Sequence, residues 1–554
     1  MFGWWKRRLP AEVAPQQEVD LSGKLSEAEQ SFVRRDYQAT ARALQVVLDA
    51  QPMHPRALHL QGVVMACQGA LPSALEAFKR SLASDNKNAD VHADFGNALF
   101  LSGYRDSAEL EYRQAIKLSA SKAMFHCSLA NLLRAGRQEE AIPFYLAALE
   151  LDPQFEDALL GLIFISYERL DYLKALDGLM RLQRIRELRV MEYAMLGDSL
   201  LNIGHLTEAE AALSAGLRTE SDNPWLQYHL GVLYLVQGNW LDGFALFEKR
   251  TDAVLACNPT LRAWLAENAR RLGSLPRWTG GPLAGQSILV WAEQGYGDTI
   301  QLLRLLPELV QRGARQVVLL GEEPLRRLVE QGAGLSFCAS IEETDLKAFD
   351  CHCSVMSLPH LLKLEPDHLS KCSAYLSVPE DQREVWAIKL AHLPGLKVGI
   401  VWQGNPAMQL DALRSMSLAD LEPLYTLRGI SWLSLQKGGD GPNQLLASGL
   451  PVTDLMVDCN DFMDTAALIE NLDLVLAVDT SVSHLAGALG KPVWLLNRFE
   501  SDWRRSRDSE STVWYPSMRV ITQEKPRQWG GVIEIVRREL DRMLIVADSK
   551  GMEC

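Results

Sequence analysis

A small residue recurs every 33 or 34 positions through the first half of the chain, and this period constrains the fold more than any single motif does. The small residue occurs at Thr40, Ala74, Ala108, Ala141, Ala175, Ala209 and Gly243. An aromatic residue or a leucine follows each of them after four positions, at Leu44, Phe78, Tyr112, Tyr145, Leu179, Leu213 and Phe247. Small residues let paired helices approach closely, and the large residues fill the gap between repeats. The period therefore predicts a stack of helical pairs.

Glycines keep the same period. Turn glycines fall at Gly69, Gly103, Gly136, Gly204 and Gly238, and small residues of the first helix at Gly62, Gly96, Ala130, Gly197 and Gly231. Residues 21–257 resemble seven tetratricopeptide repeats, preceded by a tail of residues 1–20. The resemblance implies an all-α solenoid whose concave groove binds a protein segment. The alternative role for the solenoid is a rigid spacer or a dimerisation surface. Only Asn97 and Asn131 suit the polar ladder that would bind the backbone of an extended peptide.

The pattern changes after residues 258–285, a junction that ends in a Gly- and Pro-rich linker. Short apolar runs then alternate with helical patterns, which predicts parallel sheets covered by helices. A linker at 379–395 divides this half into two Rossmann-like lobes, 286–378 and 396–525, and a C-terminal helix and tail occupy 526–554. The predicted strands are 287–292, 316–320, 349–353, 397–402, 429–435, 474–478 and 493–496. The predicted helices include 299–313, 324–331 and 464–472.

Residues 473–496 read as a strand, a turn, a helix of small residues and a second strand. The turn and the helix bring together Asp479, Thr480, Ser481 and His484. Open α/β sheets bind ligands at the carboxyl ends of their strands, and free amides at a helix N-terminus favour phosphate. The stretch therefore predicts a phosphate-binding turn, and an ordinary βαβ unit with a polar cap is the alternative.

Two stretches resemble the heptosyltransferase-like glycosyltransferases of family 9. EQGYGDTIQLLR at 293–304 resembles the glycine–aspartate turn of this family, and VDTSVSHLAGALGKPVWLL at 478–496 resembles its donor motif. Residues 276–520 as a whole resemble the bacterial proteins that fuse tetratricopeptide repeats to such a transferase. These proteins are laid out like O-GlcNAc transferase and the flagellin-modifying transferases. The resemblance implies an α + α/β chain: an all-α solenoid followed by a GT-B pair of lobes with a cleft between them.

The first lobe is expected to serve the acceptor. The resemblance favours Asp298 as the general base that takes a proton from the acceptor hydroxyl. Glu293 and Gln294 lie on the same turn and are candidates for orienting the acceptor, with Glu293 as the fallback base. Gly295 and Gly297 allow a tight turn whose backbone can approach a ligand. A helix-capping role is the alternative for Asp298.

The second lobe is expected to hold the nucleotide sugar. Thr480 and Ser481 would bind its phosphate groups, and Asp479 would bind its sugar hydroxyls. His484 would donate a hydrogen bond to a phosphate or to the sugar, and the alternative is that it only packs within the helix. A fixed guanidinium stabilises a departing phosphate, and Arg414 is the strong cation of the loop after the first strand of this lobe. The other candidate donor contacts at strand ends are Gln403, Asn405, Gln436 and Lys437.

Several classes of partner and site are disfavoured. A net charge of −14 argues against a nucleic-acid groove, and no apolar run is long enough to span a bilayer. Nine cysteines without the spacing of a disulfide scaffold indicate a reducing, cytoplasmic setting. No metal is expected, because strand alternation would point Cys351 and Cys353 away from His352. No cofactor is expected beyond the nucleotide sugar, which is a co-substrate.

The expected function is an inverting, metal-independent glycosyltransferase in the bacterial cytoplasm. It would move a sugar to a Ser or Thr hydroxyl of a protein held by the repeats, such as flagellin. Two alternatives stay open: transfer to a glycan or lipid-linked acceptor in surface polysaccharide synthesis, and a scaffold whose transferase lobes have decayed. The nucleotide, the sugar, the acceptor, the oligomeric state and the choice between Asp298 and Glu293 as base also stay open.

Overall fold

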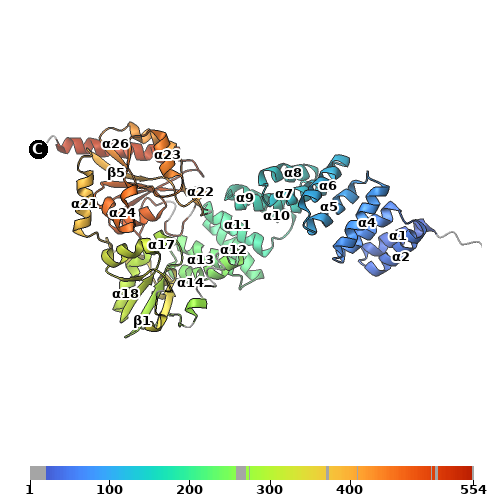
Figure 1. Ribbon diagram of the computed structural model, residues 1–554, viewed down its shortest axis with the longest axis horizontal. Coiled ribbons are helices and arrows are strands. Elements are labelled where there is room, and N and C mark those ends of the chain that lie inside the picture. The colour runs from blue at the N-terminus through green and yellow to red at the C-terminus, as the bar shows by residue number, and fades with distance from the viewer. Residues whose placement is uncertain are drawn as a thin grey trace, which may run out of the picture. The chain divides into compact units, whose positions relative to one another are not determined.

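The computed structural model describes residues 20–257, 267, 270–273, 275–342, 344–369, 374–408, 410–500, 502–505 and 509–551. The chain divides into two compact units (Figure 1). The first runs from the N-terminus to Glu168 and includes Met180–Arg186, and the second takes Arg169–Leu179 and the chain from Glu187 onward. The predicted tail lies outside the described residues except for Asp20, the N-cap of α1 (Leu21–Val33).

Helical hairpins confirm the predicted repeats. The helices of the first four pairs are α1 and α2 (Tyr37–Ala50), α3 (Pro55–Cys67) and α4 (Leu71–Ser84), α5 (Ala89–Leu101) and α6 (Arg105–Leu118), and α7 (Ala123–Arg134) and α8 (Gln138–Leu151). The next pairs are α9 (Glu156–Glu168) and α10 (Tyr172–Ile185), α11 (Val190–Asn202) and α12 (Leu206–Thr219), and α13 (Pro224–Val236) and α14 (Trp240–Phe247), followed by α15 (Arg250–Cys257). Each pair of α1 to α14 corresponds to one predicted repeat.

The small and large residues of the period pack as their sizes predict. A Cβ on Gly62 would lie 2.7 Å from the ring of Phe78, and a Cβ on Gly96 would lie 2.7 Å from the ring of Tyr112. The Tyr112 hydroxyl donates a hydrogen bond of 2.8 Å to Asn97. The side-chain oxygen of Asn97, one of the two expected groove asparagines, is thus engaged inside its own repeat.

Each turn between paired helices contains a residue of positive φ. Gly69, Gly103, Gly136, Gly204 and Gly238 all have this conformation, as the period predicts. In the first and fifth hairpins the same place is taken by Arg35 (φ 59°) and Leu170 (φ 58°). Side chains other than glycine adopt this region at a cost of about 1–2 kcal/mol, so these two turns carry strain that the other turns avoid.

We expect Arg35→Gly to stabilise the repeats by about 0.5–1 kcal/mol, because glycine removes the strain at a moderate cost in chain entropy. Arg35 is exposed, so no packing is lost. Arg34→Gly is the matched control: Arg34 is also exposed but has a φ of −77°, so glycine there should destabilise. Urea unfolding followed by circular dichroism measures both changes. Equal effects of the two substitutions would contradict the assignment of strain to Arg35.

The second half folds into two parallel sheets, as the alternating pattern predicts. The first sheet has the order β3-β2-β1-β4, with β1 (Ser287–Trp291), β2 (Gln316–Leu320), β3 (Ser336–Cys338) and β4 (Cys351–Ser354). The second has the order β10-β9-β8-β5-β6-β7. Its strands are β5 (Leu396–Val401), β6 (Ile430–Ser434), β7 (Val452–Asp454), β8 (Leu474–Val478), β9 (Val493–Asn497) and β10 (Met518–Thr522).

Helices cover both sheets (Figure 1). They are α17 (Tyr296–Leu302), α18 (Leu306–Gln311), α19 (Leu358–Leu361), α20 (Pro366–Leu369), α21 (Glu380–Leu390), α22 (Asp411–Arg414), α23 (Gly441–Ser448), α24 (Phe462–Glu470), α25 (Ser481–Ala488) and α26 (Gly530–Gly551). The predicted helix 299–313 is interrupted by a 3-10 turn at Leu303–Leu305, where Pro307 begins a new helix. The predicted interlobe linker contains α21, which buries Trp386 and Leu390.

The predicted boundary after residue 257 does not separate compact units. Trp240, Phe244 and Phe247 of α14 belong to the same hydrophobic core as the first lobe and part of the second. The reason is that α14 is unusually aromatic, and its rings are buried against Trp503 and Trp514 of the second lobe. Of the predicted linker, residues 267, 270–273 and 275–285 are described, and Arg277 pairs with His352 of β4.

Candidate active site

Helices α17 and α25 contact each other, and Figure 1 shows α17 where the two lobes join. Each begins directly after a parallel strand, α17 after β1 and α25 after β8. A Cβ on Gly297 would lie 2.8 Å from the imidazole of His484 and 3.4 Å from the backbone of Ser481. The junction therefore requires glycine at 297, and it brings the predicted acceptor residues next to the predicted donor residues.

Asp298 lies at this junction and pairs with Arg504. The Arg504 guanidinium donates to the Asp298 carboxylate and, at 2.8 Å, to the side chain of Gln301. Burial raises the pKa of Asp298, and Arg504 offsets only part of this rise. The Asp298 side chain remains 18% exposed. A carboxylate with a raised pKa is a stronger base, and partial exposure leaves it accessible.

Asp479 is placed in the opposite electrostatic environment. The Arg505 guanidinium donates to its carboxylate at 2.8 Å, and His484 Nε2 lies 3.7 Å from it. Burial would raise the pKa of Asp479, but the surrounding cations outweigh burial and hold this pKa well below its usual range. The two aspartates therefore differ in proton affinity, as expected where one binds a proton and the other stays ionised.

His484 is buried and neutral. Burial lowers its pKa to about 3. Its Nδ1 lies 2.9 Å from the Tyr515 hydroxyl. Thr480 and Ser481 stand at the N-terminus of α25, and both are partly exposed. The structure thus brings Gly297, Asp298, Asp479 and the first turn of α25 into one cluster.

Glu293 has a different environment from Asp298. Arg250 of α15 donates to both of its carboxylate oxygens, at 2.8 and 2.6 Å, and the Ser354 hydroxyl donates to one of them. The Glu293 side chain is 6% exposed. Glu293 therefore anchors the last repeat to the first lobe. Gln294 and Gly295, which follow it, are exposed at the turn.

The remaining predicted donor residues gather at the carboxyl ends of β5 and β6. The Gln436 side-chain oxygen accepts from the backbone N–H of Gln403 at 3.0 Å, which joins these two strand ends. Arg414 Nε donates to Asp411 at 3.1 Å, and the Arg414 guanidinium packs against Gly404. Asn405 and Lys437 are exposed, with the Lys437 ammonium also donating to the carbonyl of Cys459.

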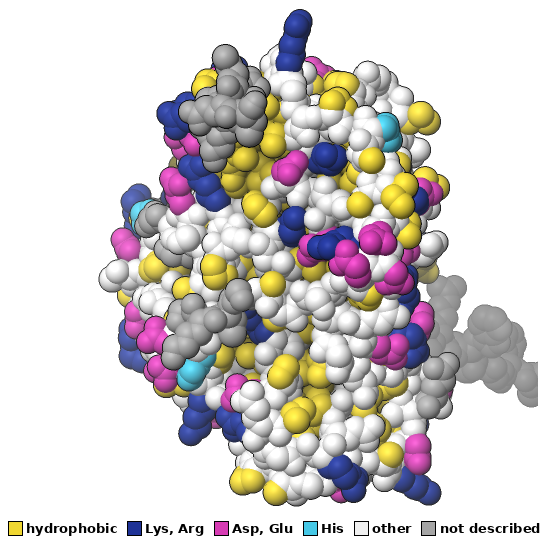
Figure 2. Space-filling view, turned by 90° about the vertical axis from the view of Figure 1, so that its left-hand side faces the viewer, with side chains coloured by type: hydrophobic (Ala, Val, Ile, Leu, Met, Phe, Trp, Pro, Cys, Tyr) yellow, Lys and Arg dark blue, Asp and Glu magenta, His cyan; other side chains and the backbone are white. Residues whose placement is uncertain are grey.

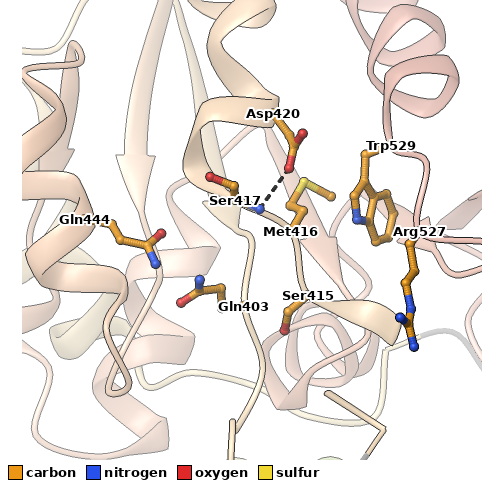
Figure 3. Close-up of a pocket in the computed structure, with 8 residues that line it drawn as sticks. All are labelled: Gln403, Ser415, Met416, Ser417, Asp420, Gln444, Arg527 and Trp529. Atoms are coloured by element: carbon orange, nitrogen blue, oxygen red, sulfur yellow. Dashed lines mark hydrogen bonds between the residues drawn. The ribbon is translucent and has the colours of Figure 1, made fainter. Parts of the chain in front are cut away.

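A pocket of about 400 Å³ opens beside this cluster. Its lining consists of Gln403, Ser415, Met416, Ser417, Asp420, Gln444, Arg527 and Trp529. Figure 3 shows Gln403 and Gln444 on one side and Trp529 with Arg527 on the other. An aromatic face with neutral amides and hydroxyls suits a heterocycle and a ribose. Only Gln403 was predicted from the sequence, because the other lining residues come from segments that carry no motif.

Sequence reasoning also missed the basic partners of the two aspartates. Arg504 and Arg505 are adjacent, yet they pair with Asp298 and Asp479 respectively. The one available signal was the run Asp502-Trp503-Arg504-Arg505, a dense charge cluster around a tryptophan.

Surface charge, helix hydropathy and possible metal ligands can also be compared with the sequence predictions. Figure 2 shows basic and acidic side chains intermingled on one face of the molecule rather than a field of one sign. Among the described residues, no helix is both long and apolar enough to cross a bilayer. Within the described ranges, no three His, Cys, Asp or Glu side chains are grouped as metal ligands. On β4, Cys351 and Cys353 are buried whereas His352 is not, as strand alternation predicts.

The tetratricopeptide repeat family model matches residues 31–89, 94–154 and 194–253. The chain carries tetratricopeptide repeats. Protein FlbA of Caulobacter vibrioides is 24% identical over 578 residues, which cover 94% of this chain and 90% of FlbA. The similarity therefore extends through the lobes as well as the repeats.

Solved structures match the repeats at low similarity. PilF of Pseudomonas aeruginosa is 15% identical and covers 37% of this chain and 95% of its own, with a TM-score of 0.35. The type IV pilus biogenesis factor PilW is 15% identical over 39% of this chain and 100% of its own, also with a TM-score of 0.35.

Proposed function

We propose that the chain is an inverting, metal-independent glycosyltransferase that acts in the cytoplasm on a protein hydroxyl. The observation that carries the proposal is the junction of α17 and α25. It sets a carboxylate of raised pKa, Asp298, beside a helix N-terminus at Thr480 and Ser481. A base and a phosphate-binding turn on facing lobes are what transfer from a nucleotide sugar requires.

Each group has a defined role in the proposed reaction. Asp298 accepts the proton of the acceptor hydroxyl while the oxygen of that hydroxyl attacks the sugar carbon. The new bond forms as the bond from that carbon to the donor phosphate breaks, on the opposite face. The amides and dipole at the start of α25 stabilise the departing phosphate. Asp479, which stays ionised, accepts hydrogen bonds from the sugar hydroxyls.

The pocket near β5 is proposed to hold the nucleoside. Its volume of about 400 Å³ falls within the range of small-molecule sites. The side chain of Trp529, which is 6% exposed, forms an apolar part of the lining, and Gln403 and Gln444 offer amides for the base edge. Arg414, two residues from the lining residue Met416, is proposed to contact a phosphate.

The repeats are proposed to hold the protein acceptor, for which flagellin is the candidate from the resemblance to flagellin-modifying transferases. Tetratricopeptide solenoids present extended concave surfaces for such segments. Holding an acceptor near the base raises the rate of transfer to one hydroxyl by proximity alone, with no additional catalytic group.

A thermal-shift screen of nucleotides and nucleotide sugars tests the proposal. A ligand at a hundred times its Kd should stabilise the folded lobes by about 2.7 kcal/mol. Gln403→Ala should abolish most of this shift, because its side chain lines the pocket. Gln528→Ala is the matched control, since Gln528 is exposed and does not line the pocket. If no nucleotide or nucleotide sugar raises the melting temperature, the proposed function is wrong.

A further inference from the structure

Five aromatic rings join the last repeat to the second lobe. Trp240, Phe244 and Phe247 come from α14, and Trp503 and Trp514 come from the segment after β9. The Trp240 and Trp514 rings stack with centroids 5.2 Å apart. Trp503 meets Phe244 edge to face at 5.7 Å and Phe247 at 5.9 Å. All five side chains are at most 9% exposed, so this contact is part of the hydrophobic core rather than a surface association.

The residue after Trp503 reaches the candidate base. The Arg504 guanidinium stacks on the Trp503 ring, 4.1 Å from its centroid, and donates to Asp298. The same guanidinium holds Gln301, one turn further along α17. Trp503 thus contacts the last repeat with its ring, and the adjacent Arg504 fixes the first turn of α17. The Trp503 ring is therefore one of the contacts that hold the guanidinium paired with Asp298.

The last repeat also holds the other end of the same turn. Arg250 of α15 binds both carboxylate oxygens of Glu293, five residues before Asp298. Arg250 also donates to Glu248 at 2.6 Å and to the Ser357 hydroxyl at 3.1 Å. The last repeat therefore fixes both ends of the turn that carries the candidate base. The contact at Glu293 is direct, and the contact at Asp298 passes through Trp503 and Arg504.

We propose that the last tetratricopeptide repeat is a positioning element of the active site, in which Phe244 and Phe247 orient Arg504 against Asp298 through Trp503. The repeat array then does more than recruit an acceptor, since its final hairpin completes the catalytic turn. The catalytic part of this inference rests on the proposed function, whereas the positioning of α17 does not.

Release of Trp503 has a definite electrostatic consequence. Asp298 faces Arg504, Asp479 and Asp502, and the neutral imidazole of His484 packs against the neighbouring Gly297. Arg504 favours the ionised form of Asp298, while burial and the other two carboxylates oppose it. If Arg504 moves away, the pKa of Asp298 rises further. The acid limb of the pH profile for turnover then moves to higher pH, because a general base must be ionised.

Phe247→Leu tests the proposal with a matched control, Phe78→Leu. Both phenylalanines occupy the same position of the repeat, which holds leucine at Leu44, Leu179 and Leu213, so the repeat itself tolerates the change. Phe78 belongs to the first unit and Phe247 contacts Trp503. In Phe247→Leu we expect amide hydrogen exchange in α17 and at 502–505 to be about fivefold faster. We expect no change there in Phe78→Leu.

The two measurements separate the possible failures. Faster exchange in α17 for Phe247→Leu alone, with an acid limb displaced to higher pH, supports the proposal. Exchange in α17 that is equal in the two variants overturns it, whatever the turnover. An unshifted acid limb despite faster exchange also overturns it, because Arg504 would then not set the protonation of the base. A wild-type chain that binds no nucleotide sugar refutes the proposed function, and the exchange comparison still decides the positioning of α17.

Discussion

Arg250→Met should lower the free energy of unfolding of the second unit by about 3–5 kcal/mol, because it leaves a buried carboxylate without its cation. Arg250 is 3% exposed and binds Glu293 with two hydrogen bonds. The carboxylates of Glu293 and Glu248 outweigh the burial of the guanidinium and raise the pKa of Arg250 above its ordinary value. Methionine fills similar space but supplies no donor. Thermal unfolding of the full chain measures the loss.

Arg383→Met is the control for this prediction. Arg383 pairs with Glu380 at 2.6 Å on the surface of α21, where the Arg383 side chain is 48% exposed. An exposed pair contributes about 0–1 kcal/mol, so this variant should melt close to wild type. Adding Glu293→Gln to Arg250→Met should recover part of the loss, since the unpaired charge is removed. If Arg250→Met costs no more than Arg383→Met, the ion pair does not hold the last repeat to the first lobe.

The repeats could be predicted from the sequence because their causes are local. Gly62 and Phe78 lie sixteen residues apart, and the same spacing of a small and a large residue recurs at Gly96 with Tyr112 and at Gly197 with Leu213. The strain at Arg35 could not be predicted, because a non-glycine residue of positive φ has no signature in a single sequence. The boundary of the second unit was missed for a related reason. The repeat pattern allows aromatic residues in α14 both when their rings are exposed to solvent and when they pack against Trp503, so the pattern does not distinguish the two.

The candidate site was predicted in two halves and not as a whole. The turns at Gly297 and Thr480 each read as a strand followed by a helix, and parallel sheets place such turns at one edge. Their partners lie far away in the chain: Arg504 is 206 positions from Asp298, and Arg250 is 43 positions from Glu293. One sequence carries no record of such pairings. For this reason the sequence favoured Asp298 over Glu293 only through the family resemblance, whereas the structure gives the two carboxylates different environments.

Asp298→Asn should lower turnover by about 10²–10⁴-fold while leaving donor binding unchanged, because it removes the proposed base but none of the phosphate contacts. Asparagine keeps the shape of the side chain, and its carbonyl oxygen still accepts a hydrogen bond from Arg504. Calorimetry with the nucleotide sugar measures donor affinity, and intact mass of the protein acceptor measures transfer. Asp464→Asn is the matched control, since Asp464 also pairs with an arginine, Arg327, at 2.9 Å.

Glu293→Gln decides between the two carboxylates of the turn. Both oxygens of its carboxylate accept hydrogen bonds from Arg250 and the side chain is only 6% exposed, so Glu293 is poorly placed to take the proton of a substrate hydroxyl. The variant should unfold at a lower temperature, yet below that temperature it should transfer sugar within about tenfold of the wild-type rate. Asp298→Asn should show the reverse pattern, with near-normal melting and lost transfer. If Glu293→Gln loses transfer while Asp298→Asn keeps it, Glu293 is the base, and Arg250 must release it during turnover.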